Sequence, residues 1–225
     1  MSETLVTEKV SIVLLEFMEP KERILHKAHE LFNRYGIRSV SMDEIAAQVG
    51  MSKKTVYQYY EDKDELVSVV FTGVMMHNKQ ACTADRACAE NALHEVFLAF
   101  EMVQEMFAEM NPSVLYDMQK YHPGAFAEFR NYRDGFLYGM IRTNLERGIA
   151  EGLYRPAIDV EVLTRYRLHS LMLAFDSEVF PANRTQLVHI EQQLLEHFLF
   201  GLATPKGQKL IETYWNQRTP KEDDK

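Results

Sequence analysis

Apolar residues recur at three- and four-residue spacing along most of the chain, with polar residues between them. The first clear stretch runs from Pro20 to Gly36, with Ile24, Ala28 and Leu31 on one face. This spacing is typical of an amphipathic helix. Proline suits a first helical turn and glycine a C-terminal stop, so the pattern predicts a first helix between Pro20 and Gly36.

A second, shorter helix is predicted to begin at Ser41. Ser41 and Glu44 have the spacing of a capping box, in which the hydroxyl and the carboxylate each accept a hydrogen bond from the other's backbone amide. The small residues Ala46 and Ala47 would let another helix cross closely. Gly50 then permits a tight turn, because a left-handed backbone conformation costs glycine little.

The third helix starts at Ser52, another favourable N-cap residue. Val56 and Tyr60 are four apart and are predicted to face inward, while the outer face carries Lys53, Lys54, Tyr57 and Gln58. Two short helices joined by a glycine turn are typical of a helix-turn-helix, whose second helix meets base edges in the major groove. Lysines on a helix are usually only solvated and tyrosines usually pack. The joint pattern of caps, small residues, turn and Lys/Tyr face favours DNA contact.

Residues 21–67, "KERILHKAHELFNRYGIRSVSMDEIAAQVGMSKKTVYQYYEDKDELV", resemble the DNA-binding domain of the TetR family of bacterial transcription regulators. The resemblance implies that Lys53, Lys54 and Tyr57 contact bases. It also implies that Ser41, Thr55, Tyr59 and Lys63 contact phosphates. The chain departs from the family at Tyr59, where many members have histidine, and at Asp43, where some have arginine. The operator therefore cannot be carried over from a relative.

The remaining pattern predicts a second, helical body. Helices are expected over 62–80, 92–110, a short segment ending at 121, one long segment over 125–154, and two closing segments over 159–179 and 184–203. The predicted fold is all-α: an N-terminal three-helix helix-turn-helix domain, then a helical ligand-binding and dimerisation domain, about nine helices in all. The expected divisions are an N-terminal extension over 1–19, the DNA-binding domain over 20–66, the helical domain over 67–204 and a polar tail over 205–225.

The resemblance implies a ligand cavity among the middle helices. Its walls are expected to include some of Met75, Phe97, Phe100, Val103, Phe107, Tyr121, Phe126, Phe129, Tyr132, Phe136 and Met140. Adaptable methionine and aromatic side chains suit a bulky apolar or planar ligand. Polar anchors could come from His94, Glu101, Arg133, Arg142 and His169. The alternative is that these apolar stripes are ordinary core.

The last predicted helix carries an apolar stripe of Leu187, Ile190, Leu194, Phe198 and Leu202. In the family the two closing helices pair with those of a second subunit, so the resemblance implies a homodimer with this stripe at its interface. A dimer would also double the contacts that one short recognition helix makes on a palindromic operator. The alternative is that the stripe packs within its own subunit.

Composition adds limits to this interpretation. The net charge of −8 does not exclude DNA binding, because phosphates respond to a local basic patch. Cys82 and Cys88 are too few for a disulfide framework and lack metal-ligand spacing. No apolar run reaches the ~20 residues of a membrane span, and residues 10–18 lack a cleavage pattern, so we expect a cytoplasmic protein that does not enter a membrane. Residues 1–17 are expected to be a mobile arm or a mis-assigned upstream start.

The sequence therefore favours a sequence-specific transcriptional regulator. The leading hypothesis is a homodimeric repressor on a double-stranded, palindromic operator, released by a small hydrophobic or aromatic effector. The alternative is an effector-independent DNA-binding or architectural protein of the same fold. An enzyme or carrier is disfavoured, since the chain has no glycine-rich phosphate loop and no nucleophile elbow. We expect no catalytic residues, cofactors or metal ligands.

Overall fold

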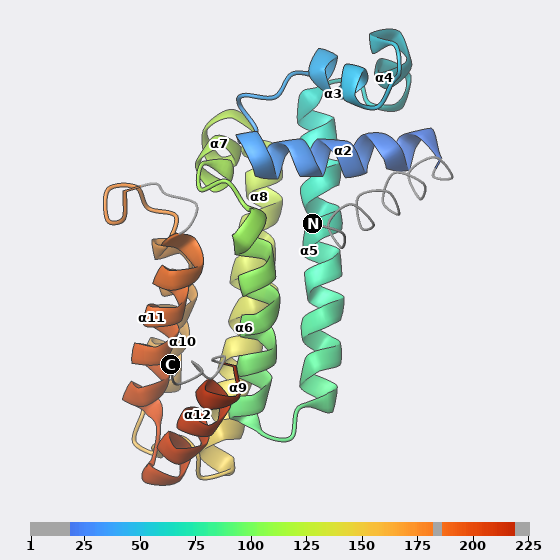
Figure 1. The fold of residues 1–225 in the computed structure, drawn as a ribbon. Helices are drawn as coiled ribbons and strands as arrows, with labels where there is room; N and C mark the ends of the chain where they lie inside the picture. Colours follow the sequence, from blue (N-terminus) through green and yellow to red (C-terminus); the bar gives the residue numbers. More distant parts are fainter. Residues whose placement is uncertain (1–18, 182–185, 219–225) are drawn as a thin grey trace, which may run out of the picture.

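The computed structural model describes residues 19–181 and 186–218, and within these ranges the chain is helical without strands (Figure 1). The all-α prediction is confirmed. The predicted extension over 1–19 lies outside the described residues except for Glu19. The helices are α2 (Pro20–Tyr35), α3 (Met42–Gln48), α4 (Lys53–Tyr59), α5 (Lys63–Cys88), α6 (Ala92–Glu109), α7 (Val114–Tyr121), α8 (Pro123–Asn131), the π-helix η1 (Tyr132–Leu137), α9 (Tyr138–Ala150), α10 (Val160–Leu173), α11 (Gln186–Leu202) and α12 (Pro205–Arg218).

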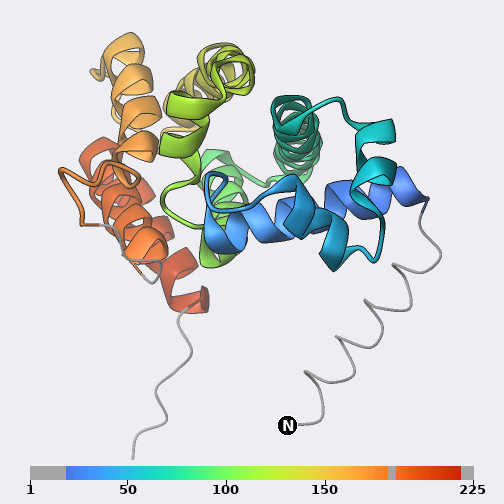
Figure 2. The ribbon, with the colours of Figure 1, turned by 90° about the horizontal axis from the view of Figure 1, so that it is seen from above.

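Helices α2, α3 and α4 form a small head at one end of α5 (Figure 1). Ile24, Phe32 and Ile45 are fully buried between them, and Leu66 from the first turns of α5 closes the same core. Viewed from above, the head lies beside the end of α5 and away from α10 and α11 on the other side of the molecule (Figure 2).

Helix α5 runs from the head along the length of the body (Figure 1). The Asp62 side chain caps its start by accepting the Glu65 amide at 2.8 Å. The predicted end near Gln80 is wrong, because the helix continues to Cys88. The small residues after Gln80 are compatible with helix, and the chain turns only where the Arg147 guanidinium holds the Ala89 carbonyl at 2.9 Å.

The predicted single helix over 125–154 is interrupted in its middle by the π-helical segment η1. Helices α8 and α9 flank it without a break in the helical run. A π-helix bonds each amide to the carbonyl five residues back, so it rotates all later side chains relative to an ideal α-helix. Any face predicted from α-helical spacing is therefore shifted beyond Tyr132.

The predicted polar tail begins with an ordered helix, α12, that packs on α6. Tyr214 and Trp215 lie against Phe97, with ring centroids 5.2 and 4.9 Å away. Arg218 pairs with Glu101 at 2.5 Å. The first part of the predicted polar tail is thus helical, and it docks because its few apolar residues fall on one helical face. The end of the predicted tail, 219–225, lies outside the described residues.

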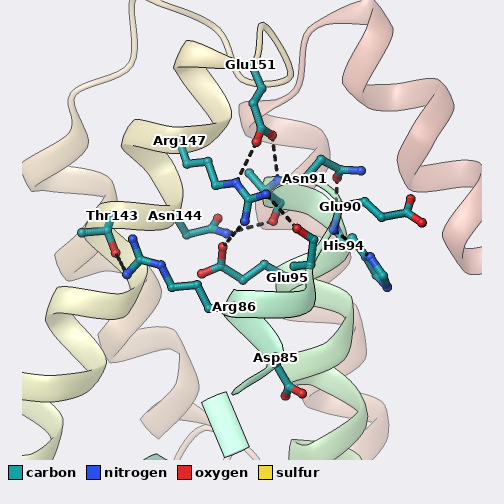
Figure 3. Close-up of polar contacts among 12 residues, drawn as sticks. Asp85, Arg86, Glu90, Asn91, His94, Glu95, Thr143, Asn144, Arg147 and Glu151 are labelled. Atoms are coloured by element: carbon teal, nitrogen blue, oxygen red, sulfur yellow. Dashed lines mark hydrogen bonds and ion pairs between the residues drawn. The ribbon is translucent and has the colours of Figure 1, made fainter. Parts of the chain in front are cut away.

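A polar cluster joins α6 to α9 at the end of the body away from the head (Figure 3). Arg147 donates to Glu95 at 3.0 Å and to Glu151 at 2.7 Å, while the Asn144 amide donates to the Ala92 carbonyl at 2.8 Å. Glu95 is almost fully buried, so its ion pair satisfies a charge that would otherwise be unfavourable. These contacts fix the far end of α6.

Candidate nucleic-acid interface and effector cavity

The turn between α3 and α4 has the geometry that the sequence predicts. Ser41 caps α3 by accepting the Glu44 amide at 3.1 Å, which is one of the two hydrogen bonds of the predicted capping box. Ser52 caps α4 by accepting the Thr55 amide at 3.1 Å. Gly50 has φ of +69°, a left-handed conformation that favours glycine. The short helices are thus positioned by local hydrogen bonds.

The inner face of α4 anchors the helix in the core of the head. Val56 is fully buried and Tyr60 is 1% exposed, as predicted. The Tyr60 hydroxyl donates to the Lys21 carbonyl at 3.3 Å, and the Arg23 guanidinium donates to the Val49 carbonyl at 2.9 Å. Helix α2 therefore holds both the turn and the end of α4.

The outer face of α4 presents the side chains expected to contact bases. Lys53, Lys54 and Tyr57 are exposed, and so is Tyr59, which was expected to contact phosphate. The Lys53 ammonium lies 5.8 Å over the Tyr57 ring. Hydrogen-bond donors and a planar aromatic ring thus lie on the same surface, which is the one expected to enter the major groove. The contacts of these side chains with DNA remain predictions.

Asp43 on α3 reaches this surface as well. Its carboxylate pairs with the Lys53 ammonium at 2.7 Å, and this hydrogen bond raises the pKa of Lys53. Both side chains are more than half exposed, so the pair contributes little to stability and separates readily. Lys53 can exchange this carboxylate for a phosphate or a base edge.

The other three predicted phosphate contacts differ in their surroundings. Ser41 is exposed; its oxygen accepts the Glu44 amide and its hydroxyl proton stays available to donate. Thr55 is half-buried and shares a hydrogen bond with Ser52 at 2.8 Å. Lys63 is half-buried and donates to the Ile37 carbonyl at 2.6 Å; burial lowers its pKa. Lys63 therefore has a structural contact that the sequence did not indicate.

A cavity of about 580 Å³, here called the main cavity, lies between the head, α5 and the middle helices. Of the predicted wall residues, it is lined by Met75, Val103, Phe107, Phe129 and Tyr132. Three polar wall residues from α2, His26, His29 and Asn33, were not predicted, because helix one was assigned wholly to DNA binding. Their spacing of three and four residues places them on one face of the helix, and this was the sequence signal that could have indicated them. A ligand here would touch the head directly.

A second cavity of about 140 Å³, here called the inner cavity, is bounded by α5, α6, α9, α10 and α11. Phe100 and Met140 were predicted for the ligand pocket and line this smaller space instead. Its charged wall residues Asp85, Glu95, Arg167 and Glu191 were missed, since single charged residues on helices give no distinctive pattern.

The remaining predicted wall residues line neither cavity. Phe97 packs against α12, and Tyr121 lies under the Arg38 guanidinium, 5.4 Å from its ring centroid. Phe126 packs on the head core beside Phe129, and Phe136 stacks on Tyr132 within η1. The five suggested anchors, His94, Glu101, Arg133, Arg142 and His169, also line neither cavity. The π-helical rotation and the unexpected α12 account for part of these errors.

The stripe predicted as a dimer interface is largely occupied within the chain. Leu187, Phe198 and Leu202 are buried in its own core, and Ile190 and Leu194 are half-buried. The outward positions of α11 are His189, Gln193 and His197. The alternative that the stripe packs in its own subunit therefore describes these three residues, and a dimer interface at Ile190 and Leu194 stays a prediction.

Within residues 19–181 and 186–218, no helix is long and apolar enough to cross a membrane. Nor do three or more histidine, cysteine or acidic side chains gather in a way that could hold a metal ion.

The N-terminal part of the chain is similar to known bacterial regulators. Residues 24–70 match the family model described as "Bacterial regulatory proteins, tetR family". The uncharacterised HTH-type transcriptional regulator YvaF of Bacillus subtilis (strain 168) is 32% identical over 112 residues, which are 47% of this chain and 55% of YvaF. This chain thus spans about half the length of that relative.

Two further proteins are similar over more of the chain. The HTH-type transcriptional repressor KstR2 of Mycolicibacterium smegmatis is 22% identical over 198 residues, 84% of this chain and 93% of KstR2. A solved putative transcriptional regulator from Saccharomonospora viridis, in complex with choline, superposes with a TM-score of 0.62 at 16% identity, covering 82% of this chain and 97% of that one. At this identity the solved structure shows a shared fold.

Proposed function

The chain belongs to the TetR family of bacterial transcriptional regulators, and on that premise we propose that it is a repressor released from its operator by a small apolar ligand. The observation that carries the proposal is the exposed face of Lys53, Lys54 and Tyr57 on α4. The opposite face of this helix is buried in the head, and the head is joined to a body with a large, mainly apolar cavity. The named repressor KstR2 and the choline complex add support.

The operator is proposed to be a palindrome in double-stranded DNA, bound by a homodimer in the cytoplasm. Helix α4 has only seven residues, and one such helix reads only a few base pairs. Two-fold pairing of subunits doubles these contacts and requires two half-sites related by the same symmetry.

The ligand would act through elements that belong to both the cavity and the head. Helix α5 lines the main cavity and also carries Leu66 in the head core. The segment leading into α7 is a second link: Asn111 donates to the Asn33 carbonyl at 2.7 Å, and Asp117 accepts the Arg38 amide at 2.9 Å. Gly36 is required beside it, because a Cβ there would lie 2.5 Å from the Ser113 hydroxyl.

A ligand that favours one packing of these elements shifts the separation of the two recognition helices by its difference in affinity for the two states. Helix α5 is the proposed lever. A crosslink that fixes the distance between the heads should then abolish the response to ligand. If a saturating ligand still changes operator affinity in the crosslinked dimer, the lever is wrong.

The alternative function is DNA binding without an effector. A filled core would favour it, whereas the main cavity of about 580 Å³ lies within the range of ligand sites, roughly 300–1,000 Å³. The cavity is therefore the observation that favours a ligand-responsive regulator.

The first test is binding to the DNA upstream of the protein's own gene, measured by fluorescence anisotropy across a salt series. Wild type is compared with Lys53→Ala and Tyr57→Ala, and with Lys209→Ala as a control that removes an exposed lysine from α12. We expect tight, sequence-selective binding that both α4 variants lose and the control keeps. Weak binding that is indifferent to sequence and to all three variants would leave only phosphate attraction and overturn the proposal.

A further inference from the structure

The main and inner cavities share part of their walls. Met102, Val103, Leu137 and Leu171 line both spaces. Both cavities are lined mainly by apolar side chains, and the wall of the inner one includes the charged residues Asp85, Glu95, Arg167 and Glu191. Its volume of about 140 Å³ is similar to that of a cavity, ~150 Å³, known to bind benzene, so it has room for a small head group. Together the two spaces have the shape of an amphipathic site.

Glu191 supplies the first polar group of the inner cavity. It is 1% exposed, and one of its carboxylate oxygens accepts a hydrogen bond from the Arg167 guanidinium. The other oxygen, Oε2, is buried and has no hydrogen-bond partner. Buried carboxylate oxygens are nearly always paired, because desolvation without a donor is unfavourable. An unpaired acceptor on a cavity wall indicates a ligand that donates.

Asp85 on α5 supplies the second polar group on the wall of the inner cavity. Figure 3 shows its carboxylate apart from the hydrogen-bonded cluster of Arg147. Burial and the neighbouring Glu101 charge raise the pKa of Asp85, and burial raises that of Glu191 against the opposing effect of Arg167. At Asp85 no positive charge opposes the effect of burial, and at Glu191 burial outweighs the effect of Arg167.

The charges on the inner wall do not balance. Arg147 pairs with Glu95, and Arg167 pairs with Glu191, so each of these carboxylates has a cation. Asp85 has none and leaves one negative charge on the wall. A neutral hydroxyl could satisfy Glu191 Oε2 but not this charge, and an anionic head group would be repelled by it.

We propose that the effector is an amphipathic amine whose apolar body fills the main cavity and whose protonated nitrogen enters the inner cavity, donating to Glu191 Oε2 and facing Asp85. The chemistry of the site is independent of DNA. Only the role of this ligand as effector rests on the proposed function.

The test uses three probes with the same ten-carbon chain: decylamine, decanol and decanoate, each below its micelle concentration. Trp215 is the chain's only tryptophan, and its ring centroid lies 5.4 Å from that of Phe100 on the inner wall, so its fluorescence reports binding in the full-length protein. Calorimetry confirms the affinities. We expect decylamine to bind at least ~10-fold more tightly than decanoate, as for a hydrogen bond to a charged group.

Glu191→Gln and Asp85→Asn keep the side-chain shape and remove one charge each. Each should weaken decylamine binding ~10-fold and leave decanol nearly unchanged. Glu90→Gln removes an exposed carboxylate that lines neither cavity and should change nothing. Asp85 is only half-buried, so its variant keeps the test valid if Glu191→Gln folds poorly.

Three results overturn this inference: decanoate binding as tightly as decylamine, equal loss of decylamine and decanol in both variants, or no binding of any probe. If the protein binds its operator selectively but does not distinguish the probes, the amine site is wrong and the proposed function stands. If it binds decylamine selectively but does not bind the operator, the amine site stands and the proposed function is wrong.

Discussion

The head and the body differ in how completely their cores are packed. In the head, Ile24, Ile45, Val56 and Tyr60 fill the core, and the side chains proposed to contact DNA lie outside it. In the body, two cavities and a buried ion pair interrupt the packing. A recognition surface requires a rigid support, since its donors must match base edges, whereas a ligand site requires space that the protein leaves unfilled. This contrast gives four predictions, ordered here by expected effect.

Removing Arg167 should have the largest effect on stability. Arg167→Met leaves the Glu191 carboxylate buried without its cation, which costs roughly 3–5 kcal/mol when the carboxylate is ionised. Burial already raises the pKa of Glu191, and loss of Arg167 raises it further. The native state then binds the proton more tightly than the unfolded chain, so stability is greatest at low pH and falls as pH rises above the unfolded value.

Urea unfolding at pH 5 and pH 8 checks this prediction. The loss in free energy of unfolding, wild type minus variant, should be larger at pH 8. The double variant Arg167→Met with Glu191→Gln should remove most of the pH dependence. A loss that is the same at both pH values would contradict it.

Truncating an apolar side chain to alanine should destabilise the head more than the wall of the main cavity. Ile24→Ala opens a void in the filled head and should lower the free energy of unfolding by about 2–5 kcal/mol. Met106→Ala trims a half-buried wall of the existing main cavity and should cost less, because fewer packing contacts are lost. Thermal and urea unfolding of both variants measure the difference. Equal losses would mean that the main cavity is closed in solution.

Loss of the cap on α4 should have a moderate effect. Ser52→Ala removes the acceptor for the Thr55 amide and should destabilise by ~1 kcal/mol. Ser52→Asp keeps the cap, so it should restore stability while weakening operator binding through repulsion of phosphates. Unfolding and anisotropy measured together separate the two roles. If Ser52→Asp binds the operator as wild type does, Ser52 lies away from the DNA.

The smallest effect on stability is expected at Asp43. Asp43→Asn breaks an exposed ion pair with Lys53 and should change the free energy of unfolding by under ~1 kcal/mol. It removes an anion from the proposed DNA face, so operator affinity should rise at low salt and the gain should shrink as salt screens it. Glu61→Gln, an exposed change beyond α4, is the control. Weaker operator binding by Asp43→Asn would show that the carboxylate itself contacts the DNA.

The sequence predicted the head closely because its signals are local. Each of Ser41, Ser52 and Asp62 accepts a hydrogen bond from an amide three residues ahead, and Gly36 and Gly50 meet their own backbone requirements. Such contacts span a few residues, so residue type and spacing suffice to place them. The inward and outward faces of the seven-residue helix α4 followed from the same short spacing.

The body was predicted in outline, but its site was not. Five of the eleven suggested wall residues line the main cavity. Phe97 packs against Trp215 of α12 instead, and Phe136 stacks on Tyr132 within the π-helix η1. The unpaired oxygen of Glu191 and the lone carboxylate of Asp85 have no sequence signature. Whether either carboxylate finds a partner depends on which side chains the neighbouring helices bring next to it.

By itself, the sequence determined the all-helical class, the helix-turn-helix and the side chains on its outer face, because helical periodicity and capping act over three to five residues. Only the tertiary structure decided the two cavities, the contact of α2 with the main one, the burial of Leu187 and Leu202, and the docking of α12. These features depend on how helices far apart in the chain pack, and the available space is set jointly by all the side chains that border it.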